Sequence, residues 1–248
     1  MSKAAQIVVD YSSALEAGSL ANVAVIAPDE GKQRFGDPAP RAAYTAAFRE
    51  ALTVGPEPVL CLVGPYGYSP AFTAAAGGRN DLAREKIDPD RVRVLNVGRS
   101  FLGLGALTAS LAAGSLPPEE ASEWLDDAGV ATGMWVVVES EHLETAPAEA
   151  FIEVPDGIPE EPYALLRVRL ASRVVGGFEA VGEATEYALA SVSSAGGVGL
   201  VANAPEGMEA WKRQTPAPVE WLGCDLPTFL STHFGEAPAF AIAPRASS

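Results

Sequence analysis

The chain has 248 residues, of which 48% are hydrophobic, and a formal net charge of −15. This composition excludes a disordered chain and supplies enough apolar material for one large domain or two smaller ones. Because so acidic a protein repels phosphodiester backbones and anionic lipid surfaces, we expect no direct binding to nucleic acid. The sequence has no stretch of about 18 consecutive apolar residues, so we also expect no stable insertion into a membrane.

The first half of the chain alternates short apolar runs with helical patterns. An apolar run that ends at Asp10 is followed by a second, Val23–Ile26, and by a helical pattern over 41–52 whose apolar side chains recur every three or four residues. A strand over Val59–Val63, a loop, a helix of small residues and a strand over Val92–Val97 come next.

The stretch SFLGLGALTASLAAG (100–114) is apolar on nearly every face of the helix that it predicts, so we expect it to pack between layers. An acidic helix opens at Pro117, and Met134–Val138 adds one more strand. Near-continuous apolar strands that are separated by helices are typical of a parallel sheet covered on both faces. We therefore predict an N-terminal α/β domain over residues 1–150.

The second half has a different character, beginning with the proline- and acid-rich turn segment VPDGIPEEP (154–162). Leu166–Leu170 then alternates apolar residues with arginines, the pattern of a strand with one solvated face. Further predicted elements are a helix over roughly 179–192, strands over 198–202 and 240–242, and a short helix around Trp211. These elements predict a C-terminal α+β domain over residues 151–248.

The number and placement of the cysteines and histidines indicate the cellular location of the protein and limit its capacity to bind metal. Cys61 and Cys224 lie far apart in apolar surroundings, so we interpret them as reduced, buried thiols of a cytoplasmic protein. The apolar stretch near residue 1 is too short for a signal peptide, which agrees with that location. The two histidines, His142 and His233, are too few for a His-rich metal site, and we expect no metal and no cofactor.

Ser69 stands between the strand and the small-residue helix in VLCLVGPYGYSPAFTAA (59–75). One interpretation is helix capping, with Ser69 at the N-cap and Pro70 as the first helical residue. The other is ligand binding, because a helix N-terminus carries free N–H groups and a partial positive charge that accept a carboxylate or phosphate. Gly64 and Gly67 would let such a ligand approach the backbone closely.

Asp10 and His233 are the other polar candidates. Asp10 ends the first strand, where open parallel sheets place ligand crevices, or else it caps the following turn. His233 precedes Gly235 in a segment typical of a tight turn facing a cleft, although a lone histidine more often has a structural role. The sequence contains no GxSxG nucleophile elbow and no GxxxxGK phosphate loop, and GLGALT (103–108) lacks the third glycine of a dinucleotide-binding fingerprint.

Four segments occur in order along nearly the whole chain: IVVDYSS (7–13), SPAFTAA (69–75), VRVLNVGRSFLGLG (92–105) and STHFGEAPAFAIA (231–243). In this order they resemble the motifs of the DegV family of two-domain fatty-acid-binding proteins. The resemblance implies the family's EDD fold, with an acyl chain in an apolar tunnel between the domains and its carboxylate held by hydroxyls and a histidine. It also implies a bacterial, cytoplasmic protein that acts as a monomer.

This sequence keeps some of the family's ligand-binding residues and replaces others. Ser69 matches the family's carboxylate-binding serine and His233 its histidine, whereas the hydroxyls of the T-S-x-P motif fall near Gly36 and Asp37, where Asp37 would repel a carboxylate. The ligand-binding candidates are Asp10, Ser12, Gly36, Asp37, Ser69, Pro70, Ala71, Asn96 and His233.

We therefore expect a protein that binds a long-chain fatty acid and catalyses no reaction alone, with the carboxylate near Ser69. The resemblance further implies a fatty acid kinase as partner, to which the bound acid is presented. Burial of ~15 methylenes at ~0.8 kcal/mol each contributes a gross ~12 kcal/mol, whereas a hydrogen bond to a charged group contributes ~1.5–3 kcal/mol. The tunnel, rather than the head-group anchor, should supply most of the affinity.

Two other hypotheses stay open at this stage. One is a divergent relative that has lost its ligand and acts as an interaction protein, its tunnel filled by aromatic side chains such as Phe35, Tyr66 or Tyr68. The other is a small-molecule enzyme that uses Asp10, Ser69 and His233 as polar groups around the cleft. It requires Ser69 and His233 to lie within hydrogen-bonding distance of each other, with the histidine oriented by a carboxylate.

Overall fold

The structure is a computed structural model. It describes residues 6–27, 39–64, 70–98, 101–114, 116–145, 152–154, 156–168, 172–190, 196–204, 206–215, 219–224 and 236–246.

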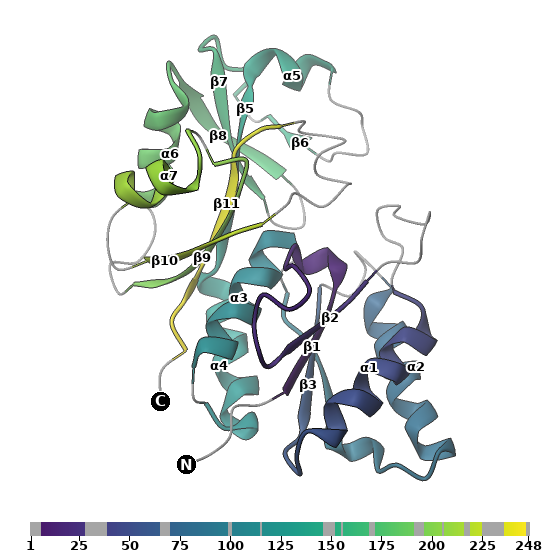
Figure 1. Ribbon diagram of the computed structural model, residues 1–248. Coiled ribbons are helices and arrows are strands. Elements are labelled where there is room, and N and C mark those ends of the chain that lie inside the picture. Colours follow the sequence, from purple (N-terminus) through teal and green to yellow (C-terminus); the bar gives the residue numbers. More distant parts are fainter. Residues whose placement is uncertain are drawn as a thin grey trace.

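A four-stranded parallel sheet occupies the N-terminal part of the chain, in the strand order β2-β1-β3-β4 (Figure 1). Its strands are β1 (Gln6–Asp10), β2 (Val23–Ile26), β3 (Val59–Val63) and β4 (Val92–Asn96). Every residue of β3 is buried, as expected for a parallel strand that is covered on both faces.

Helices α1 (Arg41–Thr53) and α2 (Ala71–Arg84) cover one face of this sheet. Tyr44 and Phe48 of α1 are fully buried there, against strand residues that include Val8 and Cys61. Ion pairs join the outer surfaces of the two helices, Arg41 with Asp81 and Arg49 with Glu85. Because these pairs are exposed, they contribute little compared with the apolar contact beneath them.

Helix α3 (Phe101–Ala113) covers the other face of the parallel sheet, beside α4 (Pro118–Ala131). All residues of α3 from Phe101 to Leu111 are buried. The helix contacts β1 and β3 on one side and strands of a second sheet on the other, so the prediction that this stretch packs between layers is confirmed.

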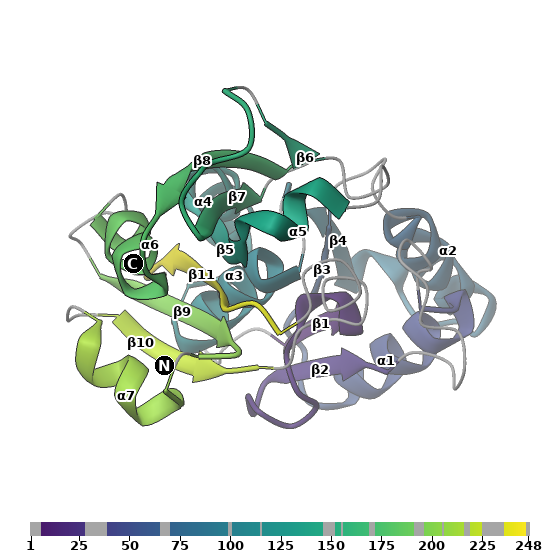
Figure 2. The ribbon, with the colours of Figure 1, turned by 90° about the horizontal axis from the view of Figure 1, so that it is seen from above.

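The second sheet has seven strands in the order β10-β9-β11-β5-β7-β8-β6. They are β5 (Gly133–Glu139), β6 (Ile152–Glu153), β7 (Tyr163–Val168), β8 (Ser172–Phe178), β9 (Gly197–Ala202), β10 (Val219–Gly223) and β11 (Ala239–Pro244). Helices α6 (Val181–Ala190) and α7 (Met208–Gln214) cover its outer face. Figure 2 shows α6 and α7 on the side of the molecule opposite α1 and α2.

The predicted architecture, a parallel α/β part followed by an α+β part, is confirmed, but one strand is assigned to a different sheet. We expected residues 134–138 in the N-terminal sheet, whereas β5 lies between β7 and β11 and is antiparallel to both. The run Gly133–Val138 is buried throughout because the second sheet is covered on both faces at this point, so its pattern resembles that of a parallel strand. The two sheets divide between β4 and β5, and a domain boundary near residue 150 stays a prediction.

Neither Cys61 nor Cys224 is in a disulfide, as predicted, but the expected burial holds for Cys61 alone, because Cys224 is half-buried. Among the described helices, none combines the length and the apolar character that a bilayer crossing needs.

Gly105 allows α3 to approach its neighbours closely. A Cβ atom at this position would collide with the carbonyl oxygen of Ser13 and would lie 2.6 Å from Cδ2 of Leu200 in β9. We therefore expect Gly105→Ala to lower the free energy of unfolding by about 1–3 kcal/mol, because added volume in a packed core forces its surroundings apart. Urea denaturation measures this change.

Gly182→Ala is the matched control, because Gly182 also lies in a helix but has open space around its Cβ position. We expect that substitution to be neutral or to stabilise the protein by up to about 1 kcal/mol, the gain in helix propensity. Equal effects of the two substitutions would contradict the close approach at Gly105.

Candidate functional site

The carboxyl end of the parallel sheet contains a topological switch point. β1 lies between β2 and β3, so the chain leaves β1 toward one side of the sheet and returns as β3 on the other. Open α/β sheets bind ligands in the crevice outside the carboxyl ends of such a strand pair. The candidate site therefore lies beyond Asp10 and Val63, and the connection 64–70, which includes Ser69, starts there.

Asp10 is 2% exposed, and both of its carboxylate oxygens have partners within the protein. The backbone N–H of Ser12 donates to Oδ1 at 3.0 Å, and the Ser12 hydroxyl donates to the same oxygen. The Tyr44 hydroxyl donates to Oδ2 at 2.8 Å. Asp10 thus caps the 3₁₀ helix η1 (Tyr11–Ser13), which confirms the capping interpretation of this residue.

Burial keeps the neighbours of Asp10 uncharged. Burial, and next the Asp10 carboxylate, raise the pKa of Tyr44 well above the usual value for tyrosine. The same two causes, in the same order, raise the pKa of the Cys61 thiol well above its usual range. Tyr44 therefore remains a hydrogen-bond donor to Asp10 at neutral pH, and Cys61 is not a nucleophile there.

Helix α2 begins one residue later than predicted. Ala71 is its first residue and is buried, and Pro70 precedes it as the exposed N-cap, with its carbonyl oxygen accepting from the N–H of Ala74 at 3.0 Å. The ψ angle of Pro70 is 10°, which departs from the helical value and explains the later start. The prediction that Pro70 is the first helical residue is therefore wrong.

Asn96 lies at the exposed end of β4 and is engaged in a local turn. Its Oδ1 accepts a hydrogen bond from the N–H of Gly98 at 3.0 Å. Such an Asx turn redirects the chain between β4 and α3. The structure therefore brings Asp10 and Ser12 together, while Asn96 serves the following connection.

The other candidates lie outside the described residues. These are Gly36, Asp37, Ser69 and His233, together with the proposed tunnel-filling residues Phe35, Tyr66 and Tyr68. Their roles, and the contact between Ser69 and His233 that the enzyme hypothesis requires, stay predictions.

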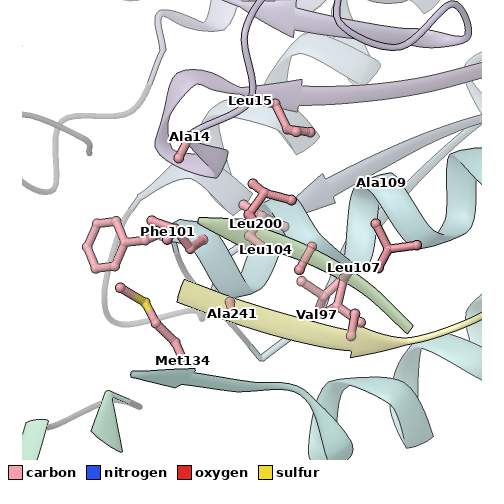
Figure 3. Packing of buried hydrophobic residues seen from close by; sticks show 14 of the residues in the cluster. Ala14, Leu15, Val97, Phe101, Leu104, Leu107, Ala109, Met134, Leu200 and Ala241 are labelled. Atoms are coloured by element: carbon pink, nitrogen blue, oxygen red, sulfur yellow. The ribbon is translucent and has the colours of Figure 1, made fainter. Parts of the chain in front are cut away.

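Phe101, at the start of α3, is a feature that the sequence interpretation missed. Its side chain lies between Ala14, which follows η1, and Met134 of β5 (Figure 3). Its φ angle of +51° is unusual for a bulky residue, and no sequence pattern predicts it. The one available signal was the placement of an aromatic residue directly after the connection from β4.

A hollow of about 660 Å³ lies away from the switch point, beside β5 and the helix α5 (Ser140–Thr145). It is lined by Glu139, Ser140, Glu141, Glu144, Ile158, Pro159, Glu160, Glu161, Pro162 and Tyr163. Because five of these side chains are glutamates, this hollow repels an anionic head group and is unsuited to a carboxylic acid. The described residues contain no group of three or more His, Cys, Asp or Glu side chains that could hold a metal ion.

The structure combines a parallel α/β part and an α+β part that share α3 between their sheets, with a ligand crevice expected at the carboxyl end of the parallel sheet. This is the fold of the DegV family. No protein-family model matches the chain, and no curated protein does.

Solved structures with this fold cover nearly all of the chain. A DegV family protein from Thermus thermophilus, described by its fatty acid binding, is 16% identical with a TM-score of 0.68 and covers 97% of this chain and 100% of its own. A stearic acid-binding protein from Eubacterium ventriosum is 12% identical with a TM-score of 0.72, covering 96% and 98%. DegV from Bacillus subtilis, a fatty acid binding protein, is 14% identical with a TM-score of 0.60, covering 97% and 99%. The family resemblance that the motifs indicated is thereby confirmed for the fold.

The hydrogen bond between Tyr44 and Asp10 supports the end of β1 at the candidate site. Tyr44→Phe leaves a buried carboxylate oxygen without this donor, so we expect the free energy of unfolding to fall by about 1–3 kcal/mol. Tyr187→Phe is the matched control, because Tyr187 is 54% exposed and should change stability by less than about 0.5 kcal/mol. Equal losses in the two variants would show that the bond does not stabilise the fold.

The stabilities of the wild type and of Tyr44→Phe should also depend differently on pH. Because the folded state raises the pKa of Tyr44, its contribution is fully present below the pKa of an unfolded tyrosine, about 10, and is lost as the pH rises above it. Above pH ~10 the stability of the wild type should therefore fall more steeply than that of Tyr44→Phe, by about 1.4 kcal/mol per pH unit.

Proposed function

We propose that this protein binds one long-chain fatty acid and catalyses no reaction alone. The observation that carries the proposal is the fold, shared over nearly the whole chain with proteins that are described as binding fatty acids, one of them stearic acid. In this proposal the acyl chain lies in an apolar tunnel between the two sheets.

The layer between the sheets supports this placement. One continuous apolar cluster contains residues of β1 and β3, of α3 and α4, and of β5, β7, β9 and β11. A chain of ~15 methylenes in such a layer gains a gross ~12 kcal/mol, from which the cost of ordering the chain is subtracted. The opposite face of the parallel sheet, under α1 and α2, forms a separate apolar cluster in which Tyr44 and Phe48 are fully buried.

The carboxylate is proposed to lie at the N-terminal end of α2, near Ser69 and Pro70. With 14 residues, α2 is long enough to concentrate partial positive charge at this end, which favours an anion. Ser69 donates a hydrogen bond to the carboxylate and His233 donates a second, from the C-terminal part of the chain. Ala71 has no hydroxyl to contribute, so the anchor relies on few groups.

The proposal also covers the oligomeric state, the location and the partner of the protein. The protein acts as a monomer in the bacterial cytoplasm and presents the bound acid to a fatty acid kinase, which phosphorylates the carboxylate. Its net charge of −15 supports the expectation that nucleic acid is not a partner.

Native mass spectrometry tests the proposal directly. The protein is delipidated, mixed with palmitate or oleate, and examined for a one-to-one complex, which we expect with either acid. Ser69→Ala should weaken binding about 10- to 150-fold, the equivalent of one hydrogen bond to a charged group.

Ser19→Ala is the matched control, because the Ser19 hydroxyl is exposed and donates to the backbone of its own turn. It should bind both acids like the wild type. Absence of any complex with the wild-type protein would overturn the proposed function.

A further inference from the structure

An exposed aromatic surface crosses the second sheet outside the candidate fatty acid site. Tyr163 of β7 lies directly opposite Phe178 of β8, so the two side chains share one face of the sheet. The centroid of the Phe178 ring lies 5.4 Å from that of Tyr187 in α6, and Tyr187 is 54% exposed. We call Tyr163, Phe178 and Tyr187 the aromatic row. Exposed apolar side chains that gather in this way mark interaction surfaces.

The aromatic row leads into the hollow beside α5, because Tyr163 belongs to both. α5 and the start of β7 lie together at the end of the molecule opposite both termini (Figure 1). Ser140, which is 7% exposed, donates its hydroxyl to the carbonyl oxygen of Glu161 at 2.6 Å and its N–H to that of Pro162 at 2.9 Å. A Cβ atom at Gly177 of β8 would collide with the Glu161 carboxylate. The wall of the hollow is therefore anchored to the sheet on two sides.

The charge of the hollow indicates what would occupy it. Its glutamates are Glu139, Glu141, Glu144, Glu160 and Glu161. Within the described part of the chain, no lysine or arginine forms an ion pair with any of them, and only His142 approaches one, Glu139, at 3.9 Å. Negative charge that is concentrated in this way attracts a positively charged partner.

The spacing of these carboxylates favours several positive charges over one. No group of three or more acidic, histidine or cysteine side chains in the described residues could hold a metal ion. The hollow also has an apolar part, formed by Ile158, Pro159, Pro162 and Tyr163, and Ile158 is 41% exposed. An occupant that matches both parts carries separate positive charges and apolar groups.

We propose that the hollow and the aromatic row bind an extended segment of a partner protein in which arginines alternate with apolar residues. The guanidinium groups enter the hollow, where they donate charge-assisted hydrogen bonds to the glutamates and stack on Tyr163. The apolar residues of the segment cover Phe178 and Tyr187. A polyamine would fill the hollow alone and leave the aromatic row exposed. This inference is independent of the proposed fatty acid site, which lies at the carboxyl end of the parallel sheet.

The experiment measures, by isothermal titration calorimetry, the binding of a synthetic peptide of alternating arginine and leucine, with spermidine as a second probe. We expect the wild type to bind the peptide, and the affinity to fall as the salt concentration rises. The double variant Glu144→Gln/Glu160→Gln removes two exposed carboxylates of the hollow. It should weaken peptide binding about 3- to 30-fold, as two partly exposed charge pairs would.

Glu120→Gln/Glu123→Gln is the matched control. Both residues are exposed on α4, away from the hollow, and each double variant removes two negative charges from a formal net charge of −15. The control should bind the peptide like the wild type. Tyr187→Ala, which shortens the aromatic row, should weaken peptide binding about 2- to 5-fold, the loss expected for one exposed aromatic contact.

Equal weakening in the two double variants would show that the peptide responds only to net charge, and would overturn this inference. Binding of spermidine without binding of the peptide would also overturn it, in favour of a site for a small polycation. Neither result bears on fatty acid binding, which is measured separately with palmitate and oleate.

Discussion

The burial of α3 between two sheets is the constraint on which the rest of the structure depends. The helix supplies apolar side chains to both sheets at once, and Gly105 lets it approach η1 and β9 closely. Its buried hydroxyls have partners: Thr108 donates to the carbonyl oxygen of Leu104 at 2.8 Å. Ser110 donates to the carbonyl oxygen of Pro244 at 2.5 Å and accepts from the N–H of Ala246 at 3.0 Å. The last described strand is thereby tied to the central helix, and no buried hydroxyl of α3 is left to oppose its burial.

This arrangement is compatible with the proposed fatty acid site, even though several motif residues of the family are replaced in this sequence. The carboxyl end of β1 is supported by the Asp10–Tyr44 hydrogen bond, which does not depend on a ligand. An acyl chain draws most of its binding free energy from apolar burial, so the absence of a hydroxyl at Ala71 removes a smaller part. The fold is retained at 11–16% identity because the pattern of buried residues, rather than their identity, specifies the layers.

Much of the fold could be predicted from local pattern. The helix over 100–114 was predicted to pack between layers because it has no polar face, and it does. The sheet assignment of β5 could not be predicted, because a strand covered on both faces has the same apolar run in a parallel and in a mixed sheet. At the candidate site, the capping role of Asp10 could be predicted from its position after the first strand. Its hydrogen bond with Tyr44 could not, because the two residues are 34 positions apart and only the folded chain brings them together. The left-handed conformation of Phe101 likewise results from tertiary packing, which no local pattern encodes.

The most direct test of the central claim, an acyl chain held between the sheets, is a crystal structure of the protein grown with excess palmitate. The account predicts continuous electron density for the acyl chain beside the first turn of α3, with the carboxylate next to the connection between β3 and α2. Side chains that fill this interval completely, with no ligand between the sheets, would contradict it.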